Sequence, residues 1–220
     1  MNKYKYVLFD LDGTISESAL GVRKSIEYTI NKFNKTMPDL DDYTLYIGPP
    51  IYDTFKNVCK FKDDEIEEAI SVYRENYDSV GKLYNKLYNG IEDLLKQLKK
   101  NKIKIAVCSS KYEKFAYEII EILGVKEYFD AVCGSTPDAS RQDKAQLIPY
   151  AISSLGGDIK EDYNKTLMIG DTYFDAEGAR ICKVDFIGVE YGYGDKEKMI
   201  AEGATKFVKT PLEILPHILP

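Results

Sequence analysis

The sequence has only one histidine, His217, three residues before the end of the 220-residue chain. Acid–base chemistry on histidine and zinc sites built from histidine are therefore not expected. Four cysteines are present, and no two of them have the Cys-x-x-Cys spacing of a metal or redox motif, so we expect buried thiols at Cys59, Cys108, Cys133 and Cys182. The chemistry of this chain must therefore depend on carboxylates, hydroxyls and lysines.

Long apolar runs are also missing. No segment approaches the roughly 20 apolar residues that a membrane-spanning helix needs, and the N-terminal run Tyr4–Phe9 is too short for a secretory signal. We expect a cytoplasmic protein without a membrane partner. The formal net charge of −6 argues against a nucleic-acid partner, since phosphate backbones are bound by clustered Lys and Arg. With 44% hydrophobic residues, the chain can close one core of ordinary size and a small second one.

Short apolar runs alternate with helix-like stretches along most of the chain, and this alternation predicts an α/β fold with a Rossmann-like parallel sheet. The expected strands are Tyr4–Phe9, Ile103–Cys108, Ala131–Cys133, Thr166–Ile169, Phe186–Val189 and Lys206–Val208. The expected crossover helices have apolar residues at three- and four-residue spacing; they are Ile91–Lys100, Lys114–Leu123, Lys144–Leu155 and Phe174–Cys182.

Residues 16–88 interrupt this alternation. The helical patterns Val22–Phe33 and Glu65–Tyr77 follow one another there with no convincing strand between them. We therefore predict an inserted all-helical cap domain at 16–88 and a Rossmann-like catalytic core formed by 1–15 together with 89–220. Tyrosine is abundant in the cap, and most of these rings are expected to pack its core or its boundary with the sheet.

Three of the apolar runs end in a polar residue: Asp10, Ser109 and Asp171. The crevice beyond the carboxyl ends of parallel strands is where open sheets bind ligands, so these three side chains are expected to converge. Each could instead start a turn or cap a helix, but Asp12 and Asp175 add two more carboxylates close by in sequence.

Asp10, Asp12, Asp171 and Asp175 would repel one another if the fold brought them together without compensation. A divalent cation relieves that repulsion. Since neither histidine nor a cysteine pair is available, the ligands would be oxygens, and oxygen ligands favour Mg²⁺. Gly13, which follows the first two acids, permits a sharp bend of the backbone.

Taken in order, Asp10-Leu11-Asp12-Gly13-Thr14, Ser109, Lys144 and Gly170-Asp171-Thr172-Tyr173-Phe174-Asp175 resemble the four motifs of the haloacid dehalogenase superfamily of hydrolases. The resemblance covers nearly the whole chain, because this superfamily can place a helical cap after the first strand. Gly48-Pro49-Pro50 and Gly192-Tyr193-Gly194 are similar to its phosphoglycolate-phosphatase-like branch.

The resemblance implies a phosphatase that acts on a small phosphorylated metabolite. Asp10 would attack phosphorus to form an aspartyl phosphate, and Asp12 would protonate the leaving alcohol and then activate water. Mg²⁺ would be bound by the side chains of Asp10 and Asp171 and by the backbone carbonyl of Asp12, with Asp175 orienting those ligands. Substrate binding is expected from Ser109, Ser110 and Lys144. Because Ala145 follows Lys144 in place of the proline that is common there in the family, Arg141 is the alternative basic residue.

Two other functions remain open: a phosphomutase of the same superfamily and a non-catalytic binding module with this fold. True dehalogenases lack an acid two residues after the nucleophile, so Asp12 argues against dehalogenation. Selectivity is expected from the cap segment 47–50, and a substrate carboxylate would need a cation there, for which Arg23, Lys24, Lys56 and Arg74 are candidates. The protein could be a monomer or a homodimer.

Overall fold

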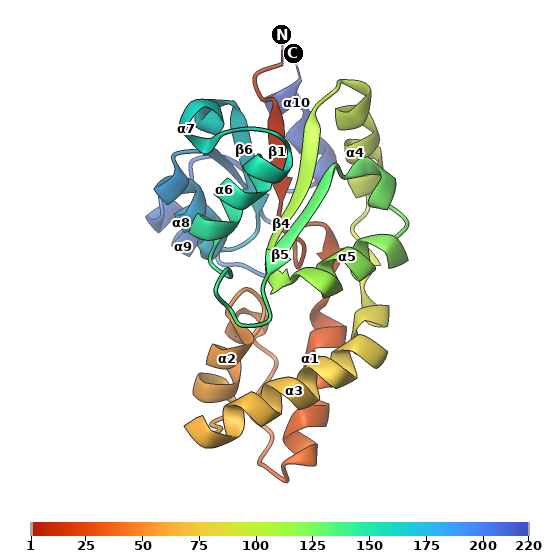
Figure 1. The fold of residues 1–220 in the computed structure, drawn as a ribbon, viewed down its shortest axis with the longest axis vertical. Helices are drawn as coiled ribbons and strands as arrows, with labels where there is room; N and C mark the ends of the chain where they lie inside the picture. Colours follow the sequence, from red (N-terminus) through yellow and green to blue (C-terminus); the bar gives the residue numbers. More distant parts are fainter. Residues whose placement is uncertain (1, 220) are drawn as a thin grey trace.

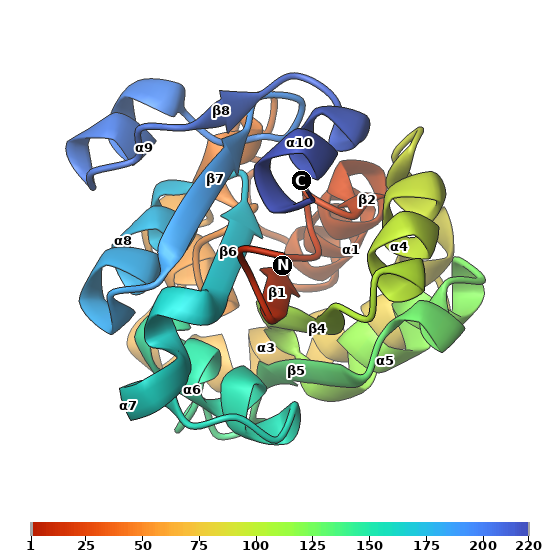
Figure 2. The ribbon, with the colours of Figure 1, turned by 90° about the horizontal axis from the view of Figure 1, so that it is seen from above.

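Six parallel strands form the central sheet of the computed structural model, which describes residues 2–219. Their spatial order is β5-β4-β1-β6-β7-β8, and Figure 2 shows the sheet from above with β1 between β4 and β6. The strands are β1 (Tyr6–Phe9), β4 (Lys104–Tyr112), β5 (Ala131–Ser135), β6 (Thr166–Gly170), β7 (Asp185–Val189) and β8 (Phe207–Val208). The predicted α/β fold with a Rossmann-like sheet is therefore confirmed.

Alternate residues of each strand face opposite layers of helices. On β1, Val7 and Phe9 belong to one apolar cluster, together with residues of the helices α4 (Ile91–Lys100), α5 (Glu113–Ile122) and α10 (Leu215–Ile218). Tyr6 and Leu8 belong to a second cluster, with residues of α6 (Lys144–Ser154) and α8 (Tyr173–Cys182). This burial on both faces explains why the strands are almost continuously apolar.

The predicted crossover helices all form, and α4 has the predicted bounds; α5, α6 and α8 differ from the prediction by one residue at one or both ends. Two short helices that the sequence did not indicate, α7 (Ile159–Asp162) and α9 (Lys196–Ala201), lie in connections between strands. Among residues 2–219, no helix is both long enough and apolar enough to cross a membrane.

Three helices, α1 (Ala19–Lys32), α2 (Ile51–Asp53) and α3 (Asp63–Ser79), lie together beyond one end of the sheet, opposite α10 (Figure 1). The helix α2 continues directly into a turn of π-helix over Thr54–Val58. One apolar cluster extends from the face of the sheet at Phe9 into this helical layer, where it includes Ile26 and Phe55. The helical layer thus shares its core with the sheet.

The prediction of an all-helical insertion needs one correction. A two-stranded antiparallel ribbon joins the helical layer to the sheet, formed by β2 (Ser16–Glu17) and β3 (Lys86–Leu87). Strands of two residues are too short to show alternation in sequence, and their pairing joins segments about 70 residues apart, which local sequence does not encode. The division into a core of 1–15 and 89–220 and a cap of 16–88 stays a prediction.

Candidate active site

The end of β1 brings the predicted polar residues together. Phe9 pairs with Val107 of β4 on one side and with Ile169 of β6 on the other. The residues that follow these positions therefore meet at one edge of the sheet, and Asp10 and Asp171 are both buried there, 7% and 0% exposed.

Lys144, at the start of α6, binds the carboxylate of Asp10. Its Nζ lies 2.6 Å from Asp10 Oδ1 and 2.6 Å from Asp175 Oδ1, and it donates to the carbonyl oxygen of Cys108 at 2.7 Å. Burial alone would lower the pKa of Lys144, but the charges of Asp10 and Asp175 outweigh burial and raise it. Lys144 is therefore a buried permanent cation between two acids. Arg141 pairs with Glu113 instead, at 2.8 Å.

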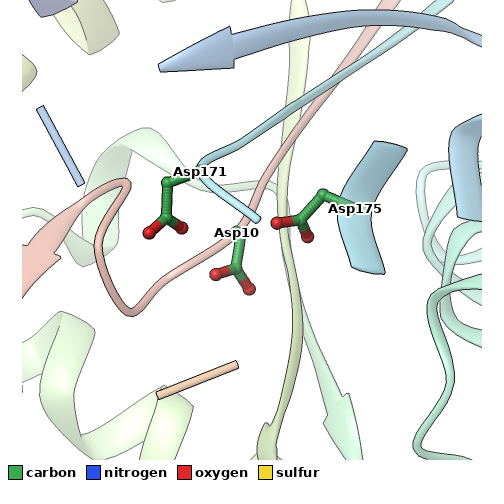
Figure 3. Close-up of side chains that lie close together, drawn as sticks. All are labelled: Asp10, Asp171 and Asp175. Carbon is green, nitrogen blue, oxygen red and sulfur yellow. The ribbon is translucent and has the colours of Figure 1, made fainter. Parts of the chain in front are cut away.

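Asp10, Asp171 and Asp175 offer carboxylate oxygens that all lie within 4.8 Å of one another (Figure 3). Burial raises the pKa of Asp10 to about 6 even though Lys144 opposes the shift. Burial, followed by the charges of Asp10 and Asp175, also raises the pKa of Asp171 well above its ordinary value. Three buried acids with one cation between two of them leave excess negative charge at Asp171.

Asp171 is enclosed by two glycine-containing loops. It accepts hydrogen bonds from Thr14 Oγ1 at 3.2 Å and from the backbone N–H of Tyr193 at 2.8 Å. Gly13 has φ +85°, and a Cβ built there would lie 2.1 Å from Asp171 Oδ2; one built at Gly192 would lie 2.4 Å from Asp171 Cβ. Positions 13 and 192 must therefore lack a side chain for the two loops to close on this carboxylate.

Asp175 has both of its carboxylate oxygens engaged. Lys144 lies beside Oδ1, and Oδ2 accepts hydrogen bonds from the backbone N–H and the hydroxyl of Thr172, at 3.1 and 2.9 Å. This is the capping box at the start of α8. The contacts of Asp175 are thus with the residues that support the site.

A cavity of about 130 Å³ lies between this edge of the sheet and the helical layer. Its lining includes Asp10, Asp12, Ser109, Ser110 and Lys144 from the sheet side. From the helical layer it includes the whole segment 47–50, which the sequence had indicated for selectivity, and the aromatic side chains of Tyr46, Tyr73 and Tyr77.

The four candidate cations of the insertion differ in whether they line the cavity and in what they contact. Arg74, on α3, lines the cavity and donates to the carbonyl oxygen of Pro137 at 3.3 Å. Arg23 binds Glu27 and Asp41, and Lys56 binds Asp63, each at 2.8 to 2.9 Å. Lys24 lies over the ring of Tyr84. Within residues 2–219, Arg74 is therefore the one candidate cation of the four that lines the cavity.

Sequence reasoning missed Lys111. Its Nζ donates to both carboxylate oxygens of Asp12, at 3.0 and 2.7 Å, and lies 4.6 Å from the centre of the Tyr77 ring. The one signal in the sequence was its position two residues after Ser109. We expected the strand to end at Cys108, whereas β4 continues to Tyr112 and includes Lys111.

The chain folds as a parallel α/β sheet beneath an inserted helical layer, and its acids, a buried lysine and hydroxyls gather at the carboxyl ends of the strands. These features together define a class of α/β proteins that carry a helical insertion over the site. The chain belongs to the haloacid dehalogenase-like hydrolase family, whose model matches residues 7–189. The superfamily predicted from the four motifs is thereby confirmed.

Proteins similar to this chain have several named activities. The tyrosine-protein kinase PtkA of Mycobacterium tuberculosis is 32% identical over 86% of this chain, which spans 62% of the length of that relative. A 5′-nucleotidase of Pseudomonas aeruginosa is 32% identical over 93% of this chain and 91% of its own. A phosphoglycolate phosphatase of Aquifex aeolicus is 31% identical over 80% of both chains.

A solved structure of a predicted phosphatase from Clostridium acetobutylicum has the same fold. It is 36% identical to this chain and superposes with a TM-score of 0.89 over 97% of each chain.

Proposed function

We propose that this chain is a Mg²⁺-dependent phosphatase that hydrolyses a small phosphomonoester through an aspartyl phosphate on Asp10. The observation that supports this proposal is the position of Asp10, at the end of β1, in the cavity wall and 2.6 Å from the ammonium of Lys144. Membership of a hydrolase family and the phosphatases among the relatives support the same reaction class.

In the first step, a carboxylate oxygen of Asp10 forms a bond to phosphorus while the bond from phosphorus to the ester oxygen breaks. Asp12 gives its proton to that leaving oxygen, so the alcohol departs neutral. Ser109 and Ser110 donate hydrogen bonds to phosphoryl oxygens from the cavity wall, and Lys144 balances negative charge on Asp10 and the phosphoryl group.

In the second step, Asp12 is a carboxylate and takes a proton from a water molecule. The oxygen of this water forms a bond to phosphorus while the bond to Asp10 breaks. Inorganic phosphate is released, and Asp10 and the protonated Asp12 are restored. The two steps therefore use the same two carboxylates in alternating roles.

The residues present fit a magnesium ion. Asp10 and Asp171 present buried carboxylates close to each other, and the described partners of Asp171 carry no positive charge: a hydroxyl and an N–H. We propose Asp10, Asp171 and the backbone carbonyl of Asp12 as its ligands, with Asp175 holding Lys144 in place. When bound, Mg²⁺ supplies positive charge that draws the phosphate and Asp10 together.

The substrate class is a small phosphorylated metabolite, phosphoglycolate-like or related. Arg74 lies in the wall of the cavity, where its guanidinium could bind a carboxylate of the substrate. The segment 47–50 lies against the site, and the relatives include a phosphoglycolate phosphatase and a 5′-nucleotidase.

A panel of phosphomonoesters, assayed with Mg²⁺ and with excess chelator, tests this proposal. We expect release of inorganic phosphate with Mg²⁺ only, and no restoration by Ca²⁺, which prefers a looser coordination of higher number. In ¹⁸O-labelled water, the released phosphate should carry the label. Full activity in excess chelator would exclude the metal.

Two outcomes would favour the other functions. Isomerisation of a hexose phosphate with little phosphate released would indicate a phosphomutase. No turnover of any ester, with the substrate still bound, would indicate a binding module.

A further inference from the structure

A bulge in β4 carries Lys111 into the cavity. Cys108 of β4 pairs with Cys133 of β5, and Tyr112 pairs with Ser135, so three residues of β4 lie opposite one residue of β5. The two extra residues displace the segment 109–111 from the regular ladder, which is a common device for directing side chains toward a site. Ser109, Ser110 and Lys111 all line the cavity as a result.

Lys111 is held by contacts from both sides of the cavity. Its side chain is 9% exposed. On the sheet side, its ammonium binds both carboxylate oxygens of Asp12, which lies in the loop after β1. The ring of Tyr77, on α3 of the helical layer, lies 4.6 Å away, within the distance of a cation–π interaction. Lys111 is therefore held between the carboxylate of Asp12 and the ring of Tyr77.

We propose that Lys111 is a positioning residue for Asp12, and that Tyr77 of α3 fixes Lys111, so that proton transfer by Asp12 depends on α3 lying over the site. This inference rests on the proposed function, in which Asp12 is the acid and base.

The chemical reason is the charge that develops on Asp12. As Asp12 gives its proton to the leaving oxygen, its carboxyl group becomes negative, and an ammonium within 3 Å stabilises that charge as it forms. Lys111 only donates hydrogen bonds and transfers no proton. Its effect should therefore depend on how much the leaving group needs a proton.

Two esters separate this role from a structural one. Ethyl phosphate has a poor leaving group that needs an acid, whereas 4-nitrophenyl phosphate has a good one that does not. We expect Lys111→Met to lower kcat/KM for ethyl phosphate by about 10- to 100-fold, the factor that a hydrogen bond to a charged group carries. For 4-nitrophenyl phosphate we expect a loss of less than about threefold.

Three further variants act as controls. Lys114→Met removes an exposed lysine three residues away, which pairs with Asp78, and should change neither value. Lys111→Arg keeps the charge and should recover much of the loss. In an Asp12→Asn background, Lys111→Met should cause less than about a threefold further loss with either ester, because residues that act through one another are not additive.

Tyr77 is tested by a pair of variants. Tyr77→Phe keeps the ring and loses only the hydroxyl, which accepts a hydrogen bond from Asn85 at 3.1 Å, so the ratio of the two kcat/KM values should stay unchanged. Tyr77→Leu removes the ring and should lower the value for ethyl phosphate selectively.

Equal losses for the two esters in Lys111→Met would overturn this inference while leaving the phosphatase proposal standing. A wild-type protein that hydrolyses neither ester with Mg²⁺ would instead overturn the proposed function and this inference with it.

Discussion

The hydroxyl of Tyr193 accepts a hydrogen bond from the backbone N–H of Ser18 at 2.8 Å, and one from Ala19 at 3.0 Å. Ser18 is the N-cap of α1, and its own side chain makes no capping bond. Tyr193 therefore caps the first helix of the inserted layer from the sheet side, while its backbone N–H binds Asp171. One residue joins the proposed metal site to the start of this layer.

Tyr193→Phe should lower the free energy of unfolding by about 1 to 2 kcal/mol, because it leaves N–H groups at the start of α1 without an acceptor. Urea unfolding measures this loss, and amide hydrogen exchange at Ser18 and Ala19 should become faster. Tyr43→Phe is the matched control, since the Tyr43 ring lies 5.6 Å from that of Tyr193 but is partly exposed, and it should change stability by less than about 0.5 kcal/mol. Unchanged exchange at Ser18 would contradict the capping role.

Gly13→Ala should abolish turnover and destabilise the protein by about 2 kcal/mol or more. The new methyl group would have to occupy space 2.1 Å from Asp171 Oδ2, in a backbone conformation with φ +85° that alanine rarely adopts. Gly124→Ala separates these two causes, because Gly124 has φ +71° but nothing lies within 4 Å of its Cβ position. This control should lose about 1 kcal/mol in urea unfolding and keep its activity. Equal effects of the two substitutions would show that crowding at Asp171 is unimportant.

Asp10→Asn should abolish phosphatase activity and leave the fold intact. The amide preserves the shape of the side chain but removes the nucleophile and a proposed metal ligand. Turnover of 4-nitrophenyl phosphate and a circular dichroism spectrum measure the two effects. Retention of more than about a tenth of wild-type activity would be incompatible with an aspartyl phosphate on Asp10.

Asp12→Asn, mixed with the same ester, should accumulate a phosphate adduct on Asp10 that mass spectrometry detects, since its hydrolysis lacks a base. An adduct on Ser109 would reassign the nucleophile.

The stability of the metal-free protein should depend on pH through Asp10. Burial raises its pKa to about 6, above the ordinary value of about 3.9 in an unfolded chain. The folded protein then binds this proton more tightly than the unfolded chain, so the stabilisation is complete below about pH 4 and is lost as the pH rises through 6.

With chelator present, the free energy of unfolding of the wild type relative to Asp10→Asn should fall by about 2 to 3 kcal/mol between pH 4 and 7. The difference between the two proteins cancels the carboxylates that lie away from Asp10, whereas Asp171, whose pKa is raised by burial and also by the charge of Asp10, contributes to it in the same direction. A difference that stays constant or rises over this range would show that burial does not dominate at Asp10.

Much of the site could be predicted from sequence because it depends on local pattern and on sheet geometry. The apolar runs before Asp10 and Asp171 are strands of a parallel sheet, and the carboxyl ends of adjacent parallel strands meet at one edge. The helix Ile91–Lys100 has its predicted bounds because its apolar spacing, its acidic first turn and its basic last turn all agree.

The contacts that control the site were decided by tertiary structure. Lys111 reaches Asp12 only because a bulge changes the register of β4, and a bulge leaves no periodic signal in sequence. Tyr193 contacts Ser18 across 175 residues of sequence, and β2 pairs with β3 although neither strand shows a periodic pattern in the sequence. The residues that could carry the chemistry were predictable from the sequence, because residue type and strand ends are local properties. Which cation binds which acid was decided by the fold, because such pairs depend on how distant segments pack.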